Sequence, residues 1–273
     1  MLVAAALLAL APGPAAPPPP APVEVVTANG RLIALPDQAV AYVPASARAN
    51  PPLLVLLHGA GRRRVTMIQH FEPEADARGV VLLAPTSRGP TWDAVSIAER
   101  VPSSDSPLAH TLALRFSVSR DEKRVEAAIA NLVKIVPVDR SRTVLAGFSD
   151  GATFALAMGM SRYEPFAAVI AWSPGIAIET EEPARRRPVF ISHGRQDPLL
   201  KFEVTCGDIV PLLEEEGAKV TFLPFDGVHE APKPVKDAFL DAVFGRVAGS
   251  QAAPLPTDAS QCRSSGSGVV PAY

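Results

Sequence analysis

Gly147-Phe148-Ser149-Asp150-Gly151 is the stretch of sequence that decides the fold. It follows the strand-like run 143–146 and precedes the apolar, helix-like run 152–157. A strand, the pattern Gly-x-Ser-x-Gly and a helix, in that order, are typical of a nucleophile elbow, a strained turn that lifts a serine hydroxyl above a sheet edge. Larger residues in place of the two glycines would collide with the neighbouring strand and helix. The stretch therefore predicts that Ser149 is a nucleophile.

The surrounding sequence alternates between predicted strands and predicted helices. Continuous apolar runs, which are typical of strands buried on both faces, lie at residues 53–57, 80–83, 144–146, 168–172, 189–192 and 220–225. Residues 23–35 and 38–44 predict a hairpin around Pro36-Asp37. Helical stripes follow Ser119, Phe202 and Pro234, and Pro211 interrupts the second stripe. This alternation predicts an α/β fold with a mostly parallel, doubly wound sheet flanked by helices.

A serine hydroxyl is a poor nucleophile at neutral pH and needs a base within hydrogen-bond reach. Among the five histidines, His229 directly follows the last predicted strand, in Asp226-Gly227-Val228-His229-Glu230. Asp197 follows the preceding strand and is the candidate acid, with Asp226 as a rival that more simply shapes the turn. The order Ser149, Asp197, His229 is the chain order of the Ser-Asp-His triad on strand–turn–helix elbows. We expect His229 to act as general base and Asp197 to fix its tautomer.

The tetrahedral intermediate of acyl transfer requires preorganised N–H donors for its oxyanion. One candidate donor is the backbone N–H of Asp150, the residue after the nucleophile. The second is expected in the loop Leu57-His58-Gly59-Ala60-Gly61, where the Ala60 N–H is our choice and Gly61 the alternative. His58 precedes the oxyanion loop and is expected to be a structural hydrogen-bonding residue, and His193 ends a predicted strand and is expected to pack under the site.

These motifs together resemble the α/β-hydrolase superfamily. The closer resemblance is to its bacterial phospholipase/carboxylesterase-like branch, which adjoins the polyhydroxybutyrate depolymerase and feruloyl esterase groups. The matching segments are 57–61, 147–151, 193–197 and 225–230, and the resemblance covers roughly residues 40 to 247. It implies the α/β-hydrolase fold and hydrolysis of carboxylic esters without a cofactor, and it leaves the ester unspecified.

Candidate substrate-binding residues surround these motifs. Gly61, Trp92, Phe148 and Trp172 are the expected lining of a substrate pocket, although core packing explains Trp172 equally well. Arg62-Arg63-Arg64 follows the oxyanion loop, either as a clamp for an acidic substrate or, more simply, as a solvated loop. No histidine, carboxylate or cysteine spacing predicts a metal site.

The composition bounds the remaining possibilities. At 273 residues the chain fits one large domain, and a net charge of -2 argues against nucleic acid as a partner. Residues 1–22 contain an apolar run that is too short to span a membrane, followed by an Ala/Pro-rich stretch. They are predicted to be either a secretory signal peptide, although no basic residue opens the run, or a disordered leader. Residues 23–247 then form the catalytic domain, and residues 248–273 a disordered tail.

The two cysteines, Cys206 and Cys262, leave two interpretations open. A disulfide would fit the secreted or periplasmic location that the leader suggests. A buried free thiol is the alternative, because Cys206 lies on an apolar helical stripe.

The sequence as a whole favours a serine esterase acting on a small-molecule or lipid-like ester. A peptidase or thioesterase on the same triad, and a non-catalytic binding protein on the same scaffold, are the alternatives.

Overall fold

The computed structural model describes residues 23–61, 63–98, 119–161, 166–177, 186–255 and 262. Their centre is a nine-stranded sheet in the order β1-β2-β3-β5-β4-β6-β7-β8-β9. The strands are β1 (Glu24–Val26), β2 (Gly30–Ala34), β3 (Val40–Pro44), β4 (Pro52–Leu57), β5 (Val81–Ala84), β6 (Asp139–Phe148), β7 (Ala168–Trp172), β8 (Pro188–Gly194) and β9 (Lys219–Phe225). Strands β1, β2, β3 and β5 pair antiparallel, and β5, β4 and β6 to β9 pair parallel. The predicted fold class is therefore confirmed.

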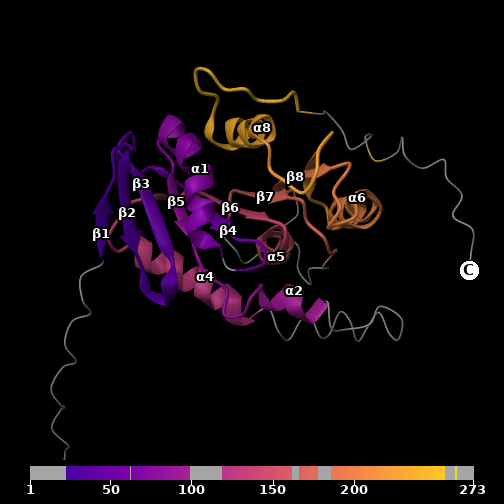
Figure 1. Ribbon diagram of the computed structural model, residues 1–273, viewed down its shortest axis with the longest axis horizontal. Helices are drawn as coiled ribbons and strands as arrows, with labels where there is room; N and C mark the ends of the chain where they lie inside the picture. The colour runs from indigo at the N-terminus through magenta and orange to yellow at the C-terminus, as the bar shows by residue number, and fades with distance from the viewer. Residues whose placement is uncertain are drawn as a thin grey trace, which may run out of the picture.

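Helices cover both faces of the sheet (Figure 1). One face is covered by α1 (Arg64–Arg78) and α8 (Lys233–Phe244). The other is covered by α2 (Asp93–Ala98), α4 (Ser119–Leu132), α5 (Asp150–Gly159), α6 (Phe202–Val204), η2 (Thr205–Ile209) and α7 (Val210–Glu215). A short 3-10 turn, η1 (Pro36–Gln38), joins β2 to β3. The helices thus form two layers with the sheet between them.

Strand β4 explains why the central strands are apolar throughout. Leu53, Val55 and Leu57 belong to the core on the α5 side, and Leu54 and Leu56 to the core on the α1 side. Because successive side chains of a strand point to opposite faces, a strand covered on both faces needs an unbroken apolar run. The continuous runs in the sequence follow from this arrangement.

The helical segment that contains Pro211 is continuous, but it changes from one helix type to another. Residues Thr205–Ile209 form a π-helical segment, and an α-helix resumes at Val210 with Pro211 in its first turn. The interruption predicted at Pro211 is therefore a local change of helix type within one continuous element.

The ends of the expected domain are described in part. Residues 1–22 lie outside the described residues, as do 256–261 and 263–273 of the expected tail. Ala252, Ala253 and Leu255 pack against the core on the α8 side, and the Ala253 N–H donates to the Pro234 carbonyl at 2.9 Å. The first part of the tail is therefore ordered against α8, although we expected the whole segment to be disordered.

Cys206 and Cys262 form a disulfide across 56 residues of sequence. Of the two interpretations left open by the sequence, the structure contains the disulfide. None of the described helices combines the length and apolar character needed to cross a membrane.

Candidate active site

Ser149 lies at the turn between β6 and α5. Its backbone has φ 57° and ψ -124°, a left-handed conformation that costs energy for a residue with a side chain. The turn is held by the Ser149 N–H, which donates to the Trp172 carbonyl at 2.9 Å. The Ser149 carbonyl in turn accepts the N–H groups of Ala152 and Thr153. The backbone therefore has the strained strand-to-helix geometry that the sequence predicts.

The two glycines beside Ser149 make this turn possible. A Cβ atom on Gly147 would lie 2.0 Å from the Gly151 carbonyl oxygen. A Cβ atom on Gly151 would lie 2.2 Å from the Leu57 carbonyl oxygen of the neighbouring strand β4. Contacts this short cannot be relieved by rotating a side chain, because the opposing atoms are backbone. The steric reason given for both glycines is thus confirmed.

Asp197 and His229 come from the loops after β8 and β9 and meet in a short contact. His229 Nδ1 donates to Asp197 Oδ2 at 2.6 Å. The Asp197 side chain is fully buried, whereas His229 retains 12% exposure. Because Nδ1 is occupied by Asp197, His229 Nε2 is the nitrogen left to accept a proton.

Opposing effects set the pKa of Asp197. Burial acts to raise the pKa, but the Leu200 N–H, the His229 ring and the Leu199 N–H all donate to the carboxylate. These hydrogen bonds, with the nearby His229, lower the pKa of Asp197 below its ordinary value. Asp197 is therefore ionised at neutral pH, as a residue that stabilises an imidazolium requires.

A cavity of about 730 Å³ contains both Ser149 and His229. Its apolar wall includes Met67 and Phe71 of α1 and Phe148 of β6. The Phe148 ring also packs against His229, with ring centroids 4.7 Å apart. The carboxyl ends of β4, β6 and β9 meet at this edge of the sheet, which is where ligands bind in open α/β sheets. The cavity is large enough for a small organic substrate.

The backbone of the loop after β4 distinguishes the two candidates for the second oxyanion donor. The Gly61 N–H donates to the Pro90 carbonyl at 2.9 Å and is therefore occupied. The Ala60 N–H has no partner among the described residues, and Ala60 lines the cavity. Asp150 begins α5, and its carboxylate accepts the Thr91 hydroxyl at 2.5 Å, so the side chain is held by Thr91. This arrangement favours the N–H groups of Ala60 and Asp150.

Three expected substrate-binding residues require correction. Trp92 and Trp172 are fully buried and belong to the two cores, so neither reaches the cavity. Gly61 is exposed but does not line the cavity either. Phe148 does line it, as expected. Aromatic residues near a site are equally suited to a core, and both tryptophans are used there.

The cavity also contains basic residues, of which the sequence predicted Arg63 as one alternative and did not predict Lys233 or Lys236. Lys233 lies 2.7 Å from Asp237, and Lys236 lies 3.0 Å from Glu74, so both are paired. Arg63 lines the cavity without a carboxylate partner in the described part of the chain. Its neighbour Arg62 lies outside the described residues. Lys233 and Lys236 directly follow the His229 loop. This closeness in sequence is the signal from which they could have been predicted as cavity residues.

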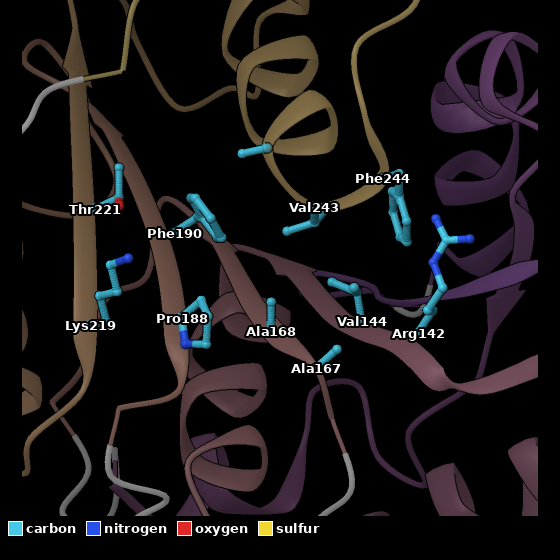
Figure 2. A pocket seen from close by; sticks show the side chains of 11 residues that line it. Arg142, Val144, Ala167, Ala168, Pro188, Phe190, Lys219, Thr221, Val243 and Phe244 are labelled. Carbon is cyan, nitrogen blue, oxygen red and sulfur yellow. The ribbon is translucent and has the colours of Figure 1, made fainter.

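Figure 2 shows a second pocket, at the opposite end of strands β6 to β9. It has a volume of about 400 Å³, and Phe190, Val243 and Phe244 form much of its apolar surface. Arg142 and Lys219 flank that surface on either side. None of the candidate catalytic side chains lines this pocket. The larger cavity is therefore the candidate active site.

Comparisons with known proteins identify the family and the fold. A sequence model of the phospholipase/carboxylesterase family matches residues 38–233. The esterase PE8 has a similar structure, with a TM-score of 0.52 at 23% identity, over 74% of this chain and 96% of its own. No curated protein matches the chain by sequence.

Two further solved structures have the same fold. A ferulic acid esterase from Anaeromyces mucronatus has a TM-score of 0.52 at 13% identity, covering 84% of this chain and 90% of its own. An S-formylglutathione hydrolase from Agrobacterium tumefaciens has a TM-score of 0.50 at 16% identity, covering 76% of this chain and 91% of its own. At these identities the similarity establishes the fold.

Proposed function

The chain belongs to the phospholipase/carboxylesterase family of α/β-hydrolases, and on that premise we propose that it is a serine esterase that cleaves carboxylic esters through an acyl-enzyme on Ser149. The observation that carries the proposal is the 2.6 Å contact between His229 Nδ1 and Asp197 Oδ2, beside a cavity that His229 shares with Ser149. A base oriented by a buried carboxylate next to a serine at an elbow is the arrangement that nucleophilic acyl transfer requires.

In the proposed mechanism, His229 Nε2 takes the proton of Ser149 Oγ as the oxygen attacks the ester carbonyl carbon. The carbonyl oxygen becomes an oxyanion, which accepts hydrogen bonds from the N–H groups of Ala60 and Asp150. One such donor typically contributes about 3 kcal/mol to transition-state stabilisation. Protonated His229 then gives its proton to the leaving alkoxide, and Asp197 stabilises the imidazolium in between.

The second half of the reaction uses the same groups. Water enters after the alcohol leaves, His229 removes a proton from it, and the resulting hydroxide attacks the acyl carbon of the acyl-enzyme. Ser149 Oγ recovers its proton from His229 when the acid is released. The cavity beside Met67, Phe71 and Phe148 supports an ester with an apolar group as the substrate.

The test is a panel of p-nitrophenyl esters of increasing acyl length, compared with one thioester and one peptide substrate at equal enzyme concentration. We expect the esters to be turned over fastest and Ser149→Ala to lose several orders of magnitude in kcat, up to about six. Ser141→Ala, at an exposed serine of the same strand, is the matched control. Equal turnover by wild type and Ser149→Ala would remove Ser149 from the mechanism, and faster cleavage of the thioester or peptide would change the substrate class.

A fluorophosphonate probe tests the nucleophile without any assumption about the ester. It should label Ser149 in the wild type, and much more slowly in His229→Ala. A wild-type protein that does not react with the probe would favour a non-catalytic role for this scaffold.

We also propose that the protein is secreted or periplasmic, which the Cys206–Cys262 disulfide supports.

A further inference from the structure

The buried Asp197 carboxylate contacts two histidines, and only one of them lines the cavity. Asp197 Oδ2 lies 2.6 Å from His229 Nδ1 and 3.1 Å from His193 Nε2. The other oxygen, Oδ1, accepts the N–H groups of Leu199 at 2.9 Å and Leu200 at 3.0 Å. The mechanism proposed above uses the contact to His229 and leaves the contact to His193 without a role.

The surroundings of His193 fix where its proton lies. The side chain, on β8, is fully buried. Its Nε2 lies 3.0 Å from the Leu200 carbonyl oxygen, which can only accept a hydrogen bond, so we assign a proton to Nε2. Its Nδ1 lies 2.7 Å from Thr205 Oγ1, and the same hydroxyl lies 3.3 Å from the Pro174 carbonyl oxygen. With the proton on Nε2, Nδ1 accepts the threonine hydroxyl proton in the shorter of these two contacts. The Nε2–H is therefore shared between the Leu200 carbonyl and Asp197 Oδ2.

Burial also keeps this ring neutral. Loss of hydration lowers the pKa of His193, and neighbouring His229 lowers it further, although the Leu200 carbonyl and Asp197 act in the opposite direction. The titratable groups that act on the ring are Asp197 and His229. The other surrounding elements face it with uncharged residues, which are Thr205 of η2, Phe202 of α6 and, in register on β9, Pro224.

We infer that His193 is a positioning residue, a neutral hydrogen-bond donor that shares the Asp197 carboxylate with His229 and so sets how strongly that carboxylate holds the His229 proton. The inference rests on the proposed function for its catalytic consequence. A donor on Oδ2 withdraws negative charge from the oxygen that faces His229. Without it, the same oxygen would stabilise protonated His229 more strongly, and the base would become available only at higher pH.

Two substitutions at one position separate this role from packing. His193→Gln keeps an N–H donor at about the place of Nε2, whereas His193→Phe keeps a planar ring and removes the donor. The other charged and titratable residues that line the cavity with His229 are unchanged in both variants; they are Arg63, His70, Glu230, Lys233 and Lys236. We expect the acid limb of the kcat/KM profile to move up by about half a pH unit in His193→Phe. In His193→Gln it should stay within about 0.2 units of wild type.

Substitutions at Thr205 test the same chain of hydrogen bonds and keep the inference falsifiable where His193→Phe does not fold. Thr205→Val keeps the shape of the side chain and removes the hydroxyl that holds the proton on His193 Nε2. The acid limb should move in the same direction by a smaller amount. Thr205→Ser, which retains the hydroxyl, is the matched control and should behave as wild type.

Nitrogen-15 NMR of labelled histidines provides a measurement that needs no substrate. Between pH 5 and 9, His193 should keep Nε2 protonated and Nδ1 unprotonated, and the titration midpoint of His229 should rise in His193→Phe. A proton on His193 Nδ1, or an unchanged midpoint and acid limb in a folded His193→Phe protein, would overturn the inference. A shifted midpoint in a protein whose ester turnover survives Ser149→Ala would instead reject only the proposed function.

Discussion

Trp92 donates its indole N–H to the backbone carbonyl oxygen of His58 at 2.7 Å, and the two rings stack with centroids 4.7 Å apart. His58 directly follows β4 and precedes Gly59 and Ala60, so this buried contact supports the loop with the candidate oxyanion donor. The His58 ring is itself fixed, because its Nε2 accepts the Ser87 N–H at 3.1 Å and its Nδ1 lies 2.7 Å from the Gly59 carbonyl. Trp92 therefore holds His58, and with it the loop of the candidate active site, although Trp92 itself lies in the core and does not line the cavity.

We expect Trp92→Phe to reduce both stability and kcat. It removes the hydrogen bond that Trp92 donates to the buried His58 carbonyl, at a cost of about 1–3 kcal/mol. Trp172→Phe is a matched control, because the Trp172 N–H has no partner among the described residues and its removal relieves an unpaired group. Urea unfolding of both variants, with kcat on a p-nitrophenyl ester, measures the difference. Equal destabilisation by the two substitutions would contradict a supporting role for the Trp92 hydrogen bond.

The two tryptophans also show which part of the site the sequence could predict. Ser149 directly follows β6, and Asp197 and His229 lie in the loops after β8 and β9. Parallel strands bring residues at such positions to one edge of the sheet whatever the rest of the packing. Trp92 lies in a segment without periodicity, and Trp172 ends a buried strand, so nothing in the pattern says which way either ring points. The direction of each ring is decided by the helix that packs on that face of the sheet. Helix α5 lies beside Trp92, and helix α1 lies beside Trp172.

The contact between His193 and Asp197 was beyond prediction for a different reason. The two residues are four apart, a spacing that brings side chains together on a helix, but here they flank a tight turn after β8. Whether such side chains meet depends on the turn geometry and on Thr205, which comes from a π-helical segment. The sequence predicted a structural role for His193 but not its partner.

Stability should depend on pH through Asp93. Burial, and then the charge of Asp121, raise the pKa of Asp93, and hydrogen bonds from backbone N–H groups offset this only in part. A carboxyl group with a raised pKa in the folded state contributes stability below its unfolded pKa of about 3.9 and loses that contribution as the pH rises through the folded pKa. Asp93→Asn, which cannot ionise, should therefore gain stability relative to wild type between pH 4 and pH 7.

Urea unfolding at several pH values measures this gain. Asp208→Asn, at an exposed residue, controls for the loss of one negative charge. A relative stability of Asp93→Asn that stays constant or falls over this range would show that folding does not raise the pKa of the Asp93 carboxyl group.

Arg78 should contribute far more to stability than an ordinary surface arginine. Its guanidinium lies 3.0 Å from Asp237 and 2.6 Å from Asp241, and all three side chains are at most 9% exposed. Removing one partner from a buried ion pair leaves uncompensated charge and typically costs about 3–5 kcal/mol. Arg78→Met is expected to show a loss of this size in urea unfolding.

Arg31→Met is the matched control, because Arg31 and Glu24 form an ion pair with both side chains more than one third exposed. Exposed pairs contribute at most about 1 kcal/mol. Similar losses in Arg31→Met and Arg78→Met would mean that the burial of the Arg78 network has no energetic consequence.

The Cys206–Cys262 disulfide should stabilise the folded protein. A cross-link across 56 residues restricts the unfolded chain, and the chain-entropy model gives about 4 kcal/mol for a loop of this size. Cys262→Ser should unfold at lower urea concentration, and wild type treated with a reductant should behave in the same way. An additional effect of the reductant on Cys262→Ser itself would show that the loss does not come from this bond.

Arg63 should bias the site toward esters that contain a negative charge. It lines the cavity with Ser149 and His229, and in the described part of the chain no carboxylate pairs with it, whereas Lys233 and Lys236 are both paired. Arg63 is exposed, so its attraction for a substrate carboxylate is limited to about 1 kcal/mol, or a factor of about five in KM. Arg63→Gln should raise KM for the p-nitrophenyl monoester of succinate by up to that factor and leave KM for the butyrate ester unchanged. Added salt should produce the same change in wild type, because screening weakens exposed charge pairs. If both esters lose affinity equally in Arg63→Gln, the side chain contributes only packing, and the solvated-loop interpretation of the arginine run is correct.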